Sequence, residues 1–163
     1  VTLEVKPDTV TIVPEKRQEL TTDGGLDVKT HAEGLKKFIS HIKDAGIRVN
    51  LFIDPSPEAV KACHRIGSDG IEIHTGAYAG TREGQVRAAE LKRIYDTAVL
   101  SKRLGMRTHA GHGLDYYNIL PVASIREIDE FAIGYSIISR AVYVGIEEAV
   151  REMKRLITEG SGR

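Results

Sequence analysis

Five apolar, strand-like runs in this chain each end in glycine or a polar residue, and a helical pattern follows each of them. The runs lie at residues 9–13, 49–53, 71–74, 107–110 and 131–133. Parallel strands covered by helices are buried on both faces, so their chemistry emerges at their carboxyl ends. We therefore expect one sheet of parallel strands, with the functional residues in the turns that follow the strands.

Helical periodicity fills the segments between these runs. Apolar residues recur at i, i+3, i+4 and i+7 over residues 35–42, 91–98 and 146–153. Ser56 and Pro57 open a further short helix, as its N-cap and its first helical position. This succession of βα units, without adjacent hairpin strands, predicts an α/β fold.

The first turn favours a barrel over an open, doubly wound sheet. A dinucleotide-binding fold carries G-x-G-x-x-G after its first strand, whereas residues 13–17 read VPEKR. A (β/α)8 TIM barrel has eight strands in about 250 residues, so this chain supplies about the last five βα units. We expect residues 1–163 to form a single domain, the C-terminal part of such a barrel lacking its first three strands. Because the chain begins at Val1 rather than methionine, we expect the missing part to be N-terminal.

Composition argues against several classes of partner. Lysine and arginine total 23, as do aspartate and glutamate, so no basic surplus favours nucleic acid or an anionic membrane. No apolar run approaches the roughly 18 residues of a spanning helix, and no charged-then-apolar leader is seen. We therefore expect a cytoplasmic protein. The one cysteine, Cys63, is expected to be a small buried residue of a helix, rather than a reactive thiol.

Two glycine-containing turns follow the last two expected strands. Residues 111–113 read Gly-His-Gly, and residues 134–136 read Gly-Tyr-Ser ahead of a short helical stretch at 137–141. Barrels often bind phosphate on the loops after strands seven and eight, through backbone N–H groups and the start of a short helix. We expect a phosphate site here. Two ordinary tight turns are the alternative.

Two ionisable residues are candidates for acid–base chemistry. His112 lies between two glycines just after a strand, and an imidazole with an intrinsic pKa of about 6.5 suits proton transfer at neutral pH. Glu72 lies inside a strand, so its charge needs a partner, a substrate cation or a raised pKa. The alternative for His112 is a loop histidine without a catalytic role, and the alternative for Glu72 is a buried structural ion pair. His74 points the same way as Glu72, and the two could form a hydrogen-bonded unit.

We expect no metal site. His109 and His112 have neither the H-x-H spacing nor the H-E-x-x-H helix of common metal sites, and strand geometry sends them to different sides. Three further histidines are expected on helix surfaces: His31, His41 and His64. The polar segment 15–25 could cap the barrel mouth and offer hydroxyls and cations to a phosphorylated substrate, with a solvated charge run as the alternative.

Together these motifs resemble the pyridoxine 5'-phosphate synthase family, in order along nearly all of the chain. The matching segments are VPEKRQE at 13–19, TTDGGLDV at 21–28, LFID at 51–54, IEIHTG-x-YA at 71–79, AGHGL at 110–114 and IG-x-SII-x-RA at 133–141. The resemblance implies a (β/α)8 barrel transferase of vitamin B6 biosynthesis that forms a homo-octamer and uses neither metal nor organic cofactor. Its reaction condenses 3-amino-2-oxopropyl phosphate with 1-deoxy-D-xylulose 5-phosphate to give pyridoxine 5'-phosphate, phosphate and water.

The resemblance also implies residue roles. His112 is the proton donor, Glu72 stabilises a transition state with cationic character, and Thr21 binds the pentulose phosphate. Three residues hold the phosphate of the amino ketone: Gly113, Gly134 and Tyr135. At Tyr135 the family commonly has a histidine, so this chain keeps a hydrogen-bond donor there but no positive charge. Because the family's first three strands carry further acids and bases, the alternative function is a truncated, noncatalytic phosphate-binding barrel fragment that needs a partner.

Overall fold

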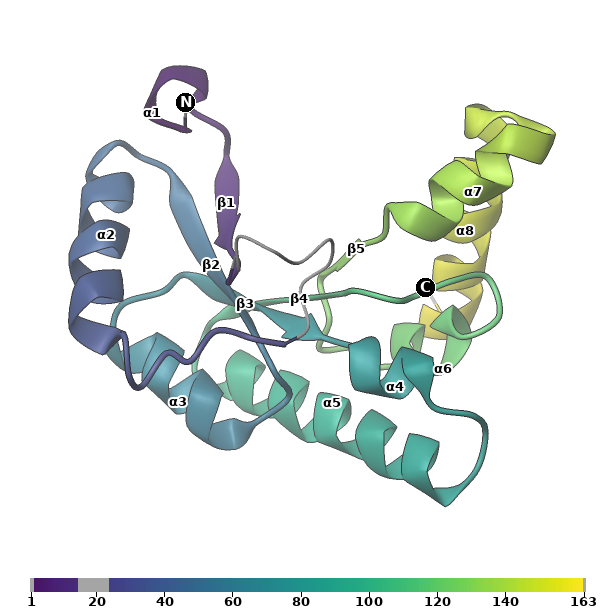
Figure 1. The fold of residues 1–163 in the computed structure, drawn as a ribbon, viewed down its shortest axis with the longest axis horizontal. Coiled ribbons are helices and arrows are strands. Elements are labelled where there is room, and N and C mark those ends of the chain that lie inside the picture. Colours follow the sequence, from purple (N-terminus) through teal and green to yellow (C-terminus); the bar gives the residue numbers. More distant parts are fainter. Residues whose placement is uncertain (1, 15–23, 163) are drawn as a thin grey trace.

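The chain forms a curved sheet of five parallel strands in sequence order (Figure 1), in a computed structural model that describes residues 2–14 and 24–162. The strands are β1 (Thr9–Ile12), β2 (Arg48–Ile53), β3 (Gly70–His74), β4 (Arg107–Gly111) and β5 (Glu130–Ala132). All five lie where the apolar runs predict them. The sheet curls into a half-barrel, which confirms the α/β class and corresponds to part of a (β/α)8 barrel.

Helices separate the strands, and several of them cover the outer face of the sheet. They are α1 (Thr2–Val5), α2 (Ala32–Asp44), α3 (Pro57–Arg65), α4 (Gly76–Gly80), α5 (Gln85–Arg103), α6 (Ile119–Ala123), α7 (Tyr135–Val144) and α8 (Ile146–Ser161). Figure 1 shows α2, α3 and α5 along one side of the sheet, with α7 and α8 packed together beyond β5. Ser56 caps α3 as predicted, because its hydroxyl oxygen accepts a hydrogen bond from the Ala59 N–H at 3.4 Å. Within the described ranges, no helix is long and apolar enough to cross a bilayer.

The face of the sheet that meets these helices is apolar. Alternate residues of β2 and β3 are completely buried in one core: Val49, Leu51, Ile53, Ile71 and Ile73. Cys63 of α3 belongs to the same core, and burial raises the pKa of its thiol to about 12. The prediction of a buried, unreactive cysteine is confirmed.

The opposite, inner face of the sheet is polar. Residues at paired positions of a parallel sheet point to the same side, and the register places Phe52, Glu72, His109 and Glu130 side by side across β2 to β5. Most of β2, β3 and β4 is nevertheless buried on both faces, as expected, since Asn50, Phe52 and His109 of the inner face are buried and Glu72 is half-buried. The inner face collects the ionisable side chains.

Candidate functional site

A cavity of about 1140 Å³ lies where β3, β4 and β5 end. Its walls include every predicted site residue that the structure describes: Glu72, His112, Gly113, Gly134 and Tyr135. The remaining predicted residue, Thr21, lies outside the described residues. Side chains and turns from three consecutive strands thus face one space, as expected for the carboxyl ends of parallel strands.

Glu72 projects from the middle of β3 onto the inner face. Its partial burial is the main reason that the pKa of this carboxyl is raised, although a hydrogen bond with Thr11 and the nearby His109 act in the opposite direction. Gly111 on β4 makes room for the carboxylate, since a Cβ at Gly111 would lie 2.8 Å from Glu72 Oε1. The site therefore holds a carboxyl group whose ionised form is poorly solvated and ready to pair with a cation.

The suggested hydrogen bond between Glu72 and His74 is wrong. His74 Nε2 has no hydrogen-bond partner among the described residues, although Glu72 lies two residues away on the same face of β3. Instead, His74 Nδ1 lies 2.9 Å from Asp54 Oδ1, across the β2–β3 pair. Asp54 follows the last residue of β2, and sequence reasoning had assigned it no role.

The backbone at His112 adopts a conformation that is uncommon outside glycine. Its φ is +79°, and the Thr75 hydroxyl lies 2.7 Å from the carbonyl oxygen of His112 and 2.7 Å from that of Gly111. Thr75 is completely buried. The turn that carries His112 is therefore anchored to the end of β3, and the imidazole is only partly exposed at the cavity wall.

The two glycine-containing turns lie next to each other. Gly113 has a φ of +78°, and a Cβ there would come within 2.7 Å of Ala79 Cβ, so the close approach requires glycine. Gly134 immediately precedes α7, and Ser136 in the first turn of that helix donates a hydrogen bond of 2.8 Å to the Leu114 carbonyl. This bond joins the second turn to the first.

Arg140 is a cavity residue to which sequence reasoning gave no role. It lies one turn after Ser136 on α7, so both side chains share a face of the helix, and both line the cavity. Its guanidinium pairs with Glu152 of α8 at 3.0 Å and lies 5.9 Å from the centre of the Tyr116 ring. The spacing of four residues from Ser136 is the signal that could have identified it.

The other histidines lie away from the cavity. His109 is buried on the inner face, where Asn50 Nδ2 lies 3.2 Å from its Nδ1 and the Glu130 carboxylate 3.6 Å from its Nε2. Three histidines are exposed as predicted: His31, His41 and His64. His31 directly precedes α2 rather than lying on it. Over residues 2–14 and 24–162, no three His, Cys, Asp or Glu side chains come close enough together to hold a metal ion.

Solved structures resemble this chain in fold. The BexX/CysO complex of Amycolatopsis orientalis matches with a TM-score of 0.66 at 10% identity, over 98% of this chain and 58% of that one. A mandelate oxidase matches with a TM-score of 0.50 at 12% identity, over 77% of this chain and 36% of that one. At such low identities the similarity concerns the fold alone.

Sequence comparison identifies much closer relatives. The chain is 56% identical over 157 residues to the pyridoxine 5'-phosphate synthase of Syntrophotalea carbinolica, covering 96% of this chain and 66% of the relative. It is 55% identical over 159 residues to the enzyme of the same name from Thermodesulfovibrio yellowstonii, covering 98% of this chain and 65% of the relative. The chain thus spans slightly less than two thirds of the length of these relatives. Residues 1–159 match the family model described as pyridoxal phosphate biosynthesis protein PdxJ, and the chain belongs to that family.

Proposed function

We propose that this chain carries the catalytic cavity of a pyridoxine 5'-phosphate synthase. The transferase would condense 3-amino-2-oxopropyl phosphate with 1-deoxy-D-xylulose 5-phosphate, giving pyridoxine 5'-phosphate, phosphate and water. The observation that carries the proposal is the shared cavity, in which an imidazole, a carboxyl of raised pKa and two joined glycine turns face one another. Relatives more than half identical to the chain bear the name of this enzyme.

The reaction demands several proton transfers. Ring closure between an amine and a ketose passes through imine and enol species, so it needs positioned acids and bases. His112 would act as the proton donor from the cavity wall. Glu72 would stabilise the cationic transition state, because a poorly solvated carboxylate gains most when a positive charge forms beside it.

Phosphate binding is assigned to the two glycine turns. Backbone N–H groups at Gly113 and at the start of α7, after Gly134, would bind the phosphate of the amino ketone, since a helix start attracts anions. The hydroxyl of Tyr135 would add a donor, and Arg140 places a positive charge on the same wall. Thr21 is proposed for the pentulose phosphate.

The domain assignment belongs to the same proposal. Residues 1–163 would be the C-terminal part of a (β/α)8 barrel that lacks its first three strands, in a cytoplasmic homo-octamer that works without a cofactor. In the described part of the chain, β1 and β5 each pair with one strand only, so both edges of the sheet offer unpaired backbone groups. Further strands at those edges would satisfy them.

Product formation tests the proposal against its alternative. Purified chain, with its mass checked against 17.9 kDa, is given both substrates, and pyridoxine 5'-phosphate and released phosphate are measured. A longer form that includes the proposed N-terminal strands, called the extended protein below, is assayed in parallel. Turnover by the extended protein supports the synthase. If neither form turns over and both still bind inorganic phosphate, the noncatalytic phosphate-binding fragment is the better description.

A further inference from the structure

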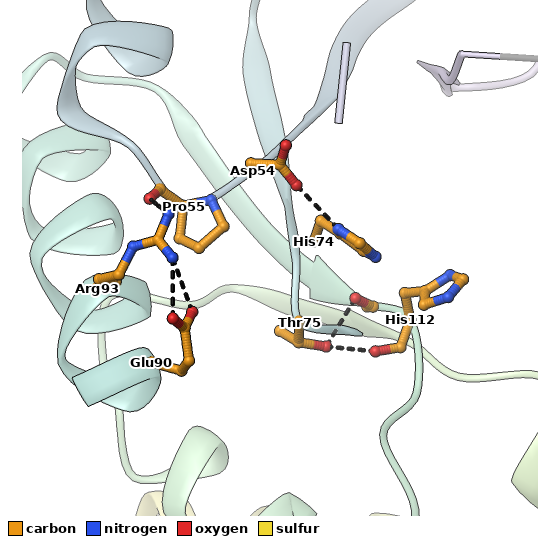
Figure 2. A network of polar contacts seen from close by, with 8 residues as sticks. Asp54, Pro55, His74, Thr75, Glu90, Arg93 and His112 are labelled. Carbon is orange, nitrogen blue, oxygen red and sulfur yellow. Dashed lines mark hydrogen bonds and ion pairs between the residues drawn. The ribbon is translucent and has the colours of Figure 1, made fainter. Parts of the chain in front are cut away.

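An aspartate–histidine pair lies beside the cavity without a role in the proposed reaction. Asp54 Oδ1 is 2.9 Å from His74 Nδ1. Neither residue lines the large cavity, although both line a smaller one of about 560 Å³ that shares His112 and Gly113 with it. Figure 2 shows His74 lying between the Asp54 carboxylate on one side and the His112 ring on the other.

The bond to Asp54 determines which nitrogen of His74 carries a proton. A carboxylate only accepts hydrogen bonds, so the proton between the two groups belongs to Nδ1 of His74. The side chain of His74 is only 10% exposed, whereas that of Asp54 is 55% exposed. Asp54 therefore fixes both the tautomer and the orientation of a ring that is otherwise enclosed in protein.

The other nitrogen of this ring is left buried. His74 Nε2 has no hydrogen-bond partner among the described residues. Burying an unpaired polar nitrogen is unfavourable, so an apolar ring would serve better at this place if packing were its only task. The imidazole therefore lowers stability at this place, and a task other than packing would account for it.

The ring of His74 supports the ring of His112. Their centroids are 4.7 Å apart with an interplanar angle of 72°, an edge-to-face arrangement, and Phe52 packs against His74 with the centroids 5.0 Å apart. Gly76 permits this approach, since a Cβ there would lie 2.5 Å from His74 Nε2 and 3.1 Å from His112 Cδ2. Thr75 thus holds the backbone of His112, and His74 contacts its ring, as Phe52 does at a centroid distance of 6.3 Å.

We propose that Asp54 and His74 form a positioning pair that orients the imidazole of His112 toward the cavity. Asp54 holds His74 through Nδ1, and the contact with the His74 ring limits the rotation of the His112 ring about its side-chain bonds. The pair touches no substrate in this account and acts through His112. It rests on the proton-donor role proposed for His112, but its geometric part can be tested without turnover.

Kinetics of the extended protein test the catalytic part. We expect Asp54→Ala and His74→Ala to lower kcat by about 10-fold or more, the scale at which residues that orient a catalytic group act, with KM for both substrates within about twofold. Asp54→Asn should restore most of kcat, because its amide oxygen still accepts the Nδ1–H bond. Asp44→Ala, at an exposed aspartate that ends α2, is the matched control and should change nothing. An unchanged kcat in Asp54→Ala, or an equal loss in Asp54→Asn and Asp54→Ala, would overturn the proposal.

Nitrogen-15 NMR of the histidine side chains tests the geometric part in substrate-free protein. His74 should show the pattern of a ring protonated at Nδ1 in the unaltered protein, in Asp44→Ala and in Asp54→Asn. In Asp54→Ala that pattern should give way to a mixture, and the ring signals of His112 should shift with it. His112 signals that are identical in all four proteins refute the positioning pair even if the enzyme is active. If the His112 signals change with the residue at position 54 but the protein shows no turnover, the positioning pair is supported and the proposed function is contradicted.

Discussion

His112 is the residue on which the proposed chemistry depends most. Two flanking glycines predict a loosely held side chain, but its carbonyl accepts a bond from buried Thr75 and its ring meets His74. Such support fits a general acid, which has to be within hydrogen-bond reach of its substrate. The sequence could identify this imidazole from its place after a strand, but not the neighbours that hold it.

His112→Ala should lower the turnover of the extended protein by about 100-fold or more, the usual scale for the loss of a general acid. His64→Ala, which removes an exposed imidazole on α3, is the control and should keep the full rate. Steady-state kinetics with both substrates give the comparison. A near-normal rate in His112→Ala would restrict this residue to a binding role.

Tyr135→His should strengthen the binding of the amino ketone. Tyr135 lines the cavity next to the start of α7, and its side chain leaves ample space, being 90% exposed. A protonated imidazole there would add a charge-assisted bond to phosphate, which is roughly twice as strong as a neutral one, so KM for the amino ketone should fall by about 3- to 10-fold. KM for the pentulose phosphate serves as the internal control. If both constants stay the same, Tyr135 is not part of the phosphate site.

Glu72→Gln should change how stability depends on pH. Burial raises the pKa of the Glu72 carboxyl above its ordinary value of 4.5, so the fold prefers the protonated form. Its contribution to stability is fully present below the unfolded pKa and is lost as pH rises through the folded pKa. Glutamine cannot ionise, so it avoids this loss. The free energy of unfolding of the variant minus that of the parent should therefore be more favourable at about pH 7 than at about pH 4. Urea unfolding of both proteins measures this; an equal difference at the two pH values would mean that Glu72 is not destabilised by ionisation.

At the scale of elements, the sequence was most informative about the strands. Each is a short apolar run that ends in a polar residue or glycine, and all five runs became strands of one parallel sheet. The two short helices α4 and α6 escaped notice because five residues are too few to show a helical period. Contacts between side chains of paired strands could not be predicted for another reason. Asp54 and His74 meet only because β2 and β3 pair in a particular register, and no local pattern in the sequence encodes that register.

Gly25→Ala tests how tightly the segment 24–28 packs on the end of β2. A Cβ at Gly25 would lie 2.1 Å from the Asp54 nitrogen and 2.5 Å from the Ile53 carbonyl carbon, and these backbone atoms cannot swing away. The Leu26 N–H also donates to the Phe52 carbonyl at 2.8 Å, which fixes the segment in place. We expect a loss of about 1–3 kcal/mol in the free energy of unfolding, the range for overpacking.

Gly34→Ala is the matched control for this substitution. Gly34 lies within α2, and a Cβ there would meet no atom within 4 Å. Alanine loses less backbone entropy in a helix than glycine, so this variant should gain about 0.5–1 kcal/mol. Urea unfolding of both variants gives the comparison. Equal stabilities would show that the contact at Gly25 relaxes without strain.

The polar inner face is the feature that matters most for the whole molecule. Glu72, His109 and Glu130 occupy neighbouring strands at one level, and buried Asn50 bonds to His109 on the same face. An ordinary open sheet would bury apolar residues there beneath helices. A barrel interior that ends in a catalytic mouth accommodates this composition, because polar groups from several strands then surround one shared cavity. The location of Glu72 thus links the proposed chemistry to the proposed closure of the barrel.

Hydrogen exchange can test that closure directly. In the 163-residue chain, β3 has a strand on each side, whereas β1 and β5 each have one neighbour within the described residues. If the longer proteins complete the barrel, the strands of the Syntrophotalea carbinolica enzyme that correspond to β1 and β5 gain a second neighbour. Their amides should then exchange about 100-fold more slowly than those of β1 and β5 here, because open edges exchange through local fluctuations. Amides of β3 are the control and should differ by less than about 10-fold. Equal rates at the edges in both proteins would mean that the additional residues of the longer enzyme pack elsewhere, and the barrel assignment would fall.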